Sequence, residues 1–199
     1  MIYPNKIDEL RLLAKAHGAD ALNISSIVLD NPQFAEWSAC HHNRGHHYGT
    51  GGLQYHTWEV AYLCETNSAY FLLESHDAYF HPMSQKVLFL AALFHDYGKI
   101  WDYQPARATQ GVAWQGTPHR RTVHHISRSA IEWAKAVEAT NVCRDVEERV
   151  LHCILSHRVH RQFGSPVAPK SREAWVLHLC DGLSARVADA DTIDLADVK

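Results

Sequence analysis

Cysteine is sparse in this sequence, and the cysteines present form no zinc-binding or disulfide pattern. The five cysteines are scattered, odd in number and never spaced as C-x-x-C. This usage argues against a zinc finger and a disulfide framework, and it is typical of reduced thiols in a cytoplasm-like compartment. We therefore expect a cytoplasmic location.

Long hydrophobic runs are missing as well. No window of the sequence approaches the ~18 uninterrupted apolar residues of a membrane helix. Acidic residues interrupt the apolar stretch of the N-terminal MIYPNKIDELRLL, unlike in a secretory signal. The sequence also has no P-loop to cradle a nucleotide phosphate and no nucleophile elbow. We expect no membrane partner and no catalysis through a side-chain nucleophile.

The sequence has no strong excess of one charge, but it is rich in histidine. Its formal net charge is −3, which argues against long duplex DNA as a partner. The stretch from Arg107 to Arg172 is nevertheless basic, with eleven Lys and Arg against five Asp and Glu. Sixteen histidines are well above ordinary usage, and histidine is the commonest metal-ligating side chain. Where the histidines lie therefore matters more than their number.

Helical periodicity dominates the chain and predicts an all-α fold. The expected helices cover residues 6–17, 31–43, 53–73, 84–97, 122–139, 144–157 and 171–188. Residues 100–118 mix aromatics with Pro and Gly, and they predict a short β-hairpin or an ordered loop. We expect a helical extension over 1–45 packed on a main domain over 46–188, and an acidic tail over 189–199.

Five helical segments each carry an imidazole or a carboxylate within a largely apolar stretch. The groups that stand out are His56, His95 with Asp96, His124 with His125, His157, and Asp181. Each histidine taken alone is more often a hydrogen-bonded core residue, and Asp181 could pair with Arg186. Together, however, such groups from separate helices can meet inside a bundle and bind metal. Imidazole combined with carboxylate suits Mn, Fe, Ni or Zn better than Ca.

The order of these residues, H…HD…H…H…D, resembles the HD-domain superfamily of metal-dependent phosphohydrolases. The segments HHYGTGGLQYHTWEV, ALFHDYGKI and ILSHRVHRQFGSPVAPKSREAWVLHLCDGLSAR are similar to the HD domain of the YhaM-type 3′–5′ exoribonucleases. The similarity covers residues 46–186. Those exonucleases also carry an OB-fold, whereas residues 1–45 here look helical and are too few for one. The resemblance implies an HD-type helical bundle.

The resemblance also implies two divalent ions, with Asp96 as a catalytic bridge between them. One ion would be held by His56, His95, Asp96 and Asp181, and the other by Asp96, His125 and His157. Two ions at such a site can lower the pKa of a shared hydroxide toward neutrality, and that hydroxide would attack phosphorus.

Two further histidines flank the implied ligands. His124 stands where that family tends to have glycine, so His125 is expected to be the ligand, although the two could be exchanged. His178 lies three residues before Asp181 on the same helix face, and it is expected to support a ligand rather than to bind metal itself. We expect the same supporting role for His124.

Lys99 matches the lysine of the family's HD-x-G-K pattern, which implies a catalytic contact with a substrate phosphate. The alternative is a solvated helix end, where the helix dipole favours a cation. The other residues expected to bind substrate are His47, Arg121, Arg158 and Arg161. Most of these basic residues could equally be ordinary surface charges.

The expected function is a metal-dependent phosphohydrolase, of the phosphodiesterase or nucleotidase type, that acts on a nucleotide or a short oligonucleotide. Some HD-fold proteins with the same six ligands instead use a mixed-valent di-iron pair to cleave C–C or C–P bonds with O₂. That oxygenase chemistry is the alternative. A nucleotide-sensing module without catalysis is a third class, which the complete ligand set disfavours.

Overall fold

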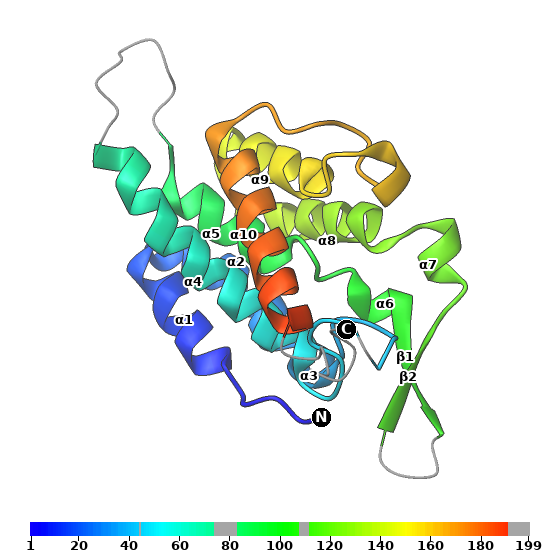
Figure 1. Cartoon of the computed structure of the whole chain (residues 1–199). Helices are drawn as coiled ribbons and strands as arrows, with labels where there is room; N and C mark the ends of the chain where they lie inside the picture. The colour runs from blue at the N-terminus through cyan, green and yellow to red at the C-terminus, as the bar shows by residue number, and fades with distance from the viewer. Residues whose placement is uncertain (44, 74–82, 108–111, 191–199) are drawn as a thin grey trace.

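The computed structural model describes residues 1–43, 45–73, 83–107 and 112–190, which form a helical bundle with a small β-hairpin at one end (Figure 1). The central helix is α5 (Gln85–Phe94), in which every residue from Val87 to Phe94 is buried. This helix is apolar on all sides, so other helices can cover it all round. Ser84 caps it by accepting a hydrogen bond from the Val87 amide at 3.3 Å.

Four helices pack against α5 and enclose its end. They are α4 (Gly52–Leu73), α8 (His125–Thr140), α9 (Arg144–Ser156) and α10 (Arg172–Ala190). Helix α10 also lies along α4, and α8 lies along α9 (Figure 1). The residues that follow α5, His95 and Asp96, are as buried as the helix itself. The polar pair is therefore presented to the interior of the bundle.

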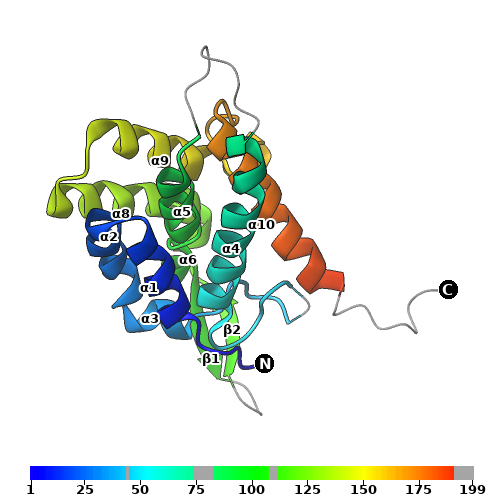
Figure 2. The same cartoon turned by 90° about the vertical axis from the view of Figure 1, so that its left-hand side faces the viewer.

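The N-terminal helices cover another side of the same core. Helices α1 (Ile7–Ala16), α2 (Ala19–Leu29) and α3 (Pro32–Glu36) precede α4. Helix α2 packs against α5 and α8, and α1 packs against α4, on the side that Figure 2 turns toward the viewer. Leu10, Ala14 and Ile24 belong to the same buried cluster as α5. The boundary expected at residue 46 stays a prediction, and most of the tail expected over 189–199 lies outside the described residues.

The segment expected to be a hairpin or a loop contains a hairpin preceded by one helical turn. Helix α6 (Lys99–Asp102) leads into β1 (Tyr103–Arg107), which pairs antiparallel with β2 (Val112–Gly116). Short helix α7 (His119–Thr122) follows, and the 3₁₀ turn η1 (Arg161–Phe163) lies between α9 and α10. The all-α class with a short hairpin is confirmed. In the described part of the chain, no helix is long and apolar enough to cross a membrane.

The expected helices differ from the structure in several places. Helix α2 was not expected, and the helix expected over 31–43 ends at Glu36. The helix expected over 122–139 begins at His125, because His124 adopts a left-handed backbone conformation with φ of 69°. Such a φ cannot continue a right-handed helix, and it is the conformation that glycine adopts most readily. The break separates α7 from α8.

Candidate metal centre

The six predicted ligands converge from five elements around the buried carboxylate of Asp96. The first group consists of His56, His95, Asp96 and Asp181. His56 Nε2 lies 3.2 Å from Asp181 Oδ1 and 3.4 Å from Asp96 Oδ2. His95 Nε2 also lies 3.4 Å from Asp96 Oδ2. In the second group, His125 Nε2 lies 3.4 Å and His157 Nε2 3.8 Å from Asp96 Oδ1. Each group has its ligand atoms within 4.8 Å of one another. The two oxygens of Asp96 therefore face different groups.

A glycine allows these elements to approach so closely. Gly98 follows Asp96 by two residues, and a Cβ there would lie 2.2 Å from the carbonyl oxygen of His125. The Gly98 amide also donates a hydrogen bond to Ser129 Oγ, at 2.9 Å. Any side chain at this position would push the start of α8 away from the end of α5. The glycine of LFHDYGK thus sets the distance between Asp96 and His125.

All six residues carry buried polar atoms that have no hydrogen-bond partner among the described residues. These atoms are His56 Nε2, His95 Nε2, Asp96 Oδ1, His125 Nε2, His157 Nε2 and Asp181 Oδ1, whereas Asp96 Oδ2 lies 2.6 Å from the ammonium of Lys99. An unsatisfied buried polar atom is costly, and one in each of six neighbouring side chains is unusual. Nitrogen lone pairs and carboxylate oxygens gathered in this way fit divalent transition ions.

The hydrogen bonds on the other side of each imidazole prepare Nε2 for a metal. His95 Nδ1 lies 2.7 Å from the carbonyl oxygen of Ala92, and His157 Nδ1 lies 2.8 Å from that of Ile154. A carbonyl can only accept, so both rings carry their proton on Nδ1 and leave a lone pair on Nε2. His125 Nδ1 likewise faces the carboxylate of Asp102 at 3.1 Å.

The fourth imidazole, His56, is oriented by a chain of polar side chains that sequence reasoning missed. His56 Nδ1 lies 3.0 Å from Ser184 Oγ, and Ser184 Oγ donates to Glu59 Oε2 at 2.9 Å. Because the single hydroxyl proton goes to the carboxylate, Ser184 accepts from His56 Nδ1–H. Their spacing from the predicted ligands could have indicated this role. Glu59 follows His56, and Ser184 follows Asp181, by three residues on the same helix face.

Asp102 was also missed. It is fully buried and accepts from three groups: the ring and amide of His125, both at 3.1 Å, and His119 Nδ1 at 2.7 Å. These contacts hold the pKa of Asp102 below its usual value, although burial opposes ionisation. A single aspartate ahead of a hairpin offers no sequence signal for this role.

The electrostatics of the centre keep the carboxylates ionised. Burial opposes ionisation of Asp96, but the charges of Lys99 and His95 outweigh it and hold its pKa well below the usual range. The pKa of Asp181 is low as well, because the imidazoles of His56 and His95 beside its carboxylate outweigh burial. Burial lowers the pKa of His157 to about 3, so this ring is neutral at neutral pH. Neutral imidazole is the form that binds metal.

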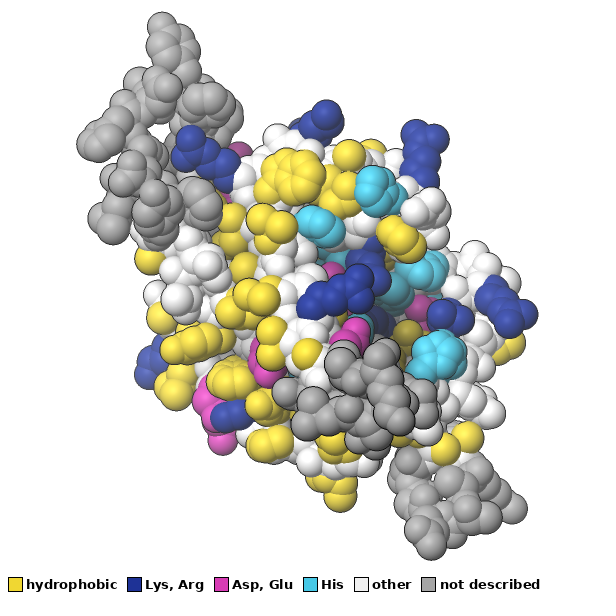
Figure 3. Space-filling model, viewed as in Figure 1, with side chains coloured by type: hydrophobic (Ala, Val, Ile, Leu, Met, Phe, Trp, Pro, Cys, Tyr) yellow, Lys and Arg dark blue, Asp and Glu magenta, His cyan; other side chains and the backbone are white. Residues whose placement is uncertain are grey.

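Lys99 is not the solvated helix end that the alternative reading allowed. Its side chain is 6% exposed, and its ammonium lies 2.6 Å from Asp96 Oδ2. Lys99 also lines a cavity of about 490 Å³ beside the centre, together with the predicted residues Arg121, Arg158 and Arg161. Histidine and Lys or Arg side chains gather around a hollow on this face (Figure 3). The structure thus brings four predicted cations to one cavity next to Asp96.

The remaining predicted residues have different positions. His124 lines the cavity, and its ring lies 4.1 Å from that of His125. The nitrogen that groups with Asp96 and His157 belongs to His125 and not to His124. His178 Nδ1 donates to the carbonyl oxygen of His157 at 2.7 Å. His47 is 2% exposed and contacts Glu59, whereas its neighbour His46 lines the cavity. The structure therefore does not bring His47 into the cavity wall.

Comparison with known proteins agrees with this arrangement. The family model of the HD domain matches residues 53–186, which span all six predicted ligands. The chain belongs to the HD domain family. Curated relatives of this HD domain include the 3′–5′ exoribonucleases YhaM of Bacillus pumilus, 31% identical over 158 residues, and of Bacillus subtilis, 28% identical over 186 residues. No solved structure gives a match.

The chain spans about half the length of these relatives. The alignment covers 78% of this chain and 44% of the Bacillus pumilus enzyme, and 92% of this chain and 49% of the Bacillus subtilis enzyme. The family and these relatives agree with the expected enzyme class, a metal-dependent hydrolase of phosphoric ester bonds.

Proposed function

We propose that this HD domain is a phosphodiesterase that uses two divalent ions to hydrolyse short RNA strands. The observation that carries the proposal is a set of six buried residues beside a cavity lined by cations, each with a ligand atom that has no hydrogen-bond partner among the described residues. One ion would be held by His56, His95, Asp96 and Asp181, and the other by Asp96, His125 and His157. Mn, Fe, Ni and Zn all suit this ligand set.

The ions and the side chains would have separate tasks. Divalent ions would supply a nucleophilic water of lowered pKa and would neutralise charge on the phosphate. Lys99, buried beside Asp96, would bind a non-bridging oxygen of the scissile phosphate. The low dielectric of this buried position would strengthen the attraction between the ammonium and the phosphate. Arg121, Arg158 and Arg161 line the same cavity and would hold neighbouring phosphates of the strand. Asp102, Ser184 and Glu59 would keep the ligand imidazoles in the required tautomer.

A short single strand fits the shape and lining of the cavity better than a duplex. The volume of about 490 Å³ is that of a small-ligand site. Tyr103 and Phe163 also line it, and aromatic side chains stack on unpaired bases. The names of the relatives, 3′–5′ exoribonucleases, support RNA as the polymer and its 3′ end as the point of attack.

The proposal is tested by incubating the purified chain with Mn²⁺, Fe²⁺, Ni²⁺ or Zn²⁺ and labelled substrates. The substrates are a five-nucleotide RNA, the matched DNA, a cyclic dinucleotide and a chromogenic phosphodiester. We expect hydrolysis of the RNA to nucleoside monophosphates, equal with and without O₂. If no phosphodiester is cleaved with any ion, the proposal is wrong. Turnover that persists without O₂ would exclude the oxygenase.

A matched pair of lysine variants tests the role of the cavity. Lys99→Met should leave the metal content unchanged but raise KM and lower kcat for the RNA. Lys86→Met is the control, because Lys86 lies on α5 and pairs with Asp20 on the surface. Equal kinetics of the two variants would remove Lys99 from substrate binding.

A further inference from the structure

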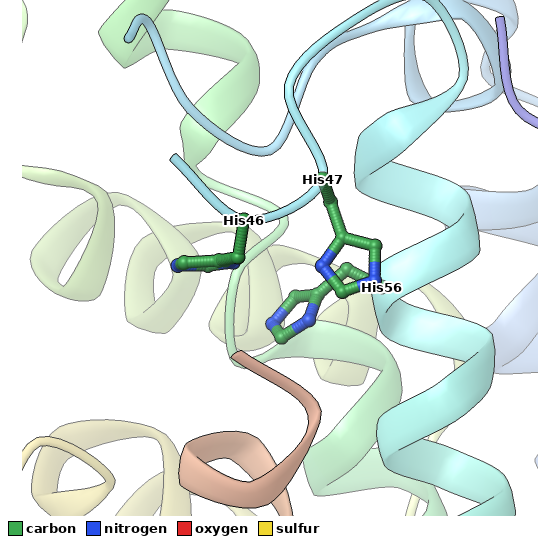
Figure 4. A group of neighbouring side chains, drawn as sticks. All are labelled: His46, His47 and His56. Carbon is green, nitrogen blue, oxygen red and sulfur yellow. The ribbon is translucent and has the colours of Figure 1, made fainter. Parts of the chain in front are cut away.

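A second group of imidazoles adjoins the metal centre on the loop that leads to α4. His46 and His47 lie on this loop and approach His56 (Figure 4). The ring centroids of His46 and His47 lie 5.3 Å and 5.0 Å from that of His56. One nitrogen from each of the three rings lies within 4.8 Å of the others. Two of these histidines have no role in the six-ligand centre.

Hydrogen bonding fixes the tautomer of His47. Its Nε2 lies 2.9 Å from Glu59 Oε2, the same oxygen that accepts from Ser184. The pKa of Glu59 is lowered, with the bond to His47 outweighing burial, so this carboxylate accepts and His47 carries its proton on Nε2. The lone pair is then on Nδ1, which is buried and has no partner in the described chain. His47 thus repeats the pattern of the four ligand histidines: one nitrogen is anchored and the other is free for a metal.

His46 offers a second nitrogen lone pair for a metal ion and lies on the route from solvent to the metal centre. Its Nδ1 is also buried without a partner among the residues described. Its side chain lines the cavity of about 490 Å³ and an adjoining cavity of about 290 Å³ that reaches Asp181. The ligands His56, His95 and His157 are fully buried, so an ion from solvent meets His46 before it meets them.

The backbone holds the two histidines firmly in place. His47 has φ of 54°, in the left-handed region that non-glycine residues rarely adopt. A Cβ at Gly52 would lie 1.9 Å from the carbonyl oxygen of His47, so glycine is needed there for the loop to pack on α4. The same carbonyl accepts from the Ala39 amide at 3.3 Å. Strained conformations that the surroundings maintain in this way are concentrated at functional sites.

We propose that His46 and His47, together with His56, form an uptake site for a divalent transition ion on its way to the HD centre. His56 Nδ1–H donates to Ser184, so His56 can offer only Nε2, which also faces Asp96 and Asp181. The two sites therefore share this nitrogen and cannot both use it at once. Transfer exchanges two neutral imidazoles for one imidazole and two carboxylates, and the added negative charge drives the ion inward. Nitrogen ligands select Zn, Ni, Co or Fe over Mg and Ca.

This inference rests on the metal centre proposed above, but not on its substrate, so the test measures metal uptake. The metal-free protein is mixed rapidly with limiting Co²⁺, and the ligand-field absorbance is followed with time. Three forms are compared: the wild type, a His46→Gln/His47→Gln variant, and a His41→Gln/His42→Gln control. The control removes another histidine pair from the same segment, one that is absent from the candidate metal clusters. Elemental analysis after desalting gives the final metal content.

We expect the His46→Gln/His47→Gln variant to reach the wild-type metal content but to load about tenfold more slowly, in the range found for residues that support metal ligands. The control should load like the wild type. Equal uptake rates in all three forms would overturn the uptake site and leave the HD centre standing. A lower final content in the variant would make the two histidines permanent ligands and would also overturn it. No uptake by the wild type would refute the metal centre itself.

Circular dichroism melting checks that the double variant is folded. If it is not, His46→Gln alone replaces it, because this change leaves the bond between His47 and Glu59 intact. The single variant should also load more slowly than the control, and an unchanged rate would count against the proposal in the same way.

Discussion

The two ligand groups that share Asp96 differ in charge. The first group contributes two carboxylates, Asp96 and Asp181, with two imidazoles. The second has two imidazoles and only its share of Asp96. His125, in the second group, is also the most exposed of the six ligands, at 8%. More negative charge and less water should make the first group bind its ion more tightly. We therefore expect one metal site of higher affinity and one of lower affinity within the same centre.

The two groups also differ in how their imidazoles are held. Both contain one ring anchored to a main-chain carbonyl, His95 or His157. The other ring of the first group, His56, relies on Ser184 and Glu59, whereas that of the second, His125, relies on Asp102. Changes to these partners should therefore affect one ion at a time.

The largest effect is expected from Asp96→Ala, because Asp96 belongs to both groups. Its loss should remove both ions and abolish turnover, and Lys99 would lose the carboxylate it pairs with. Elemental analysis of the purified variant measures the metal content, and circular dichroism checks the fold. A folded variant with full metal content would disprove the bridge.

A smaller and more selective effect is expected from breaking each group separately. Asp181→Asn removes a charge from the first group, and His157→Gln removes a ligand from the second. Each should lower the bound metal from two ions per chain toward one, with Asp181→Asn raising the Kd of the tighter ion. Competition with a chelator of known affinity separates the two ions. If both variants weakened the same ion, the division into two groups would be wrong.

The smallest effect is expected from Asp102→Asn. The amide would keep the size of the side chain but would no longer hold His125 Nδ1–H as a charged acceptor. Changes to such partners typically lower metal affinity about 10- to 100-fold. The weaker ion should be affected and the tighter one spared, as chelator competition can measure. Asp145→Asn, on the surface of α9, is the control, and an equal response of both variants would argue against the role of Asp102.

The sequence predicted the fold and the ligand residue types for a clear physical reason. An imidazole or carboxylate within an apolar helix is conspicuous, and both His95 and Asp96 follow an uninterrupted apolar run. The resemblance then assigned the six residues to their groups. The convergence of those groups on Asp96 is a long-range property, and only the packing of α4, α8, α9 and α10 around α5 brings it about.

The supporting residues were much harder to predict. The burial of Asp102 and Glu59 and the identity of their partners depend on tertiary contacts, which the local sequence does not reveal. The start of α8 was misplaced because helix propensity does not reveal the positive φ of His124. His47 was expected to contact substrate, but a sequence cannot tell which of two adjacent histidines faces a cavity.

The most direct test of the account is an anomalous-scattering measurement on crystals grown with Mn²⁺. We predict two peaks per chain, one within bonding distance of each carboxylate oxygen of Asp96, with Asp181 beside one peak and His157 beside the other. A single peak, or two peaks that do not share Asp96, would contradict the bridged centre.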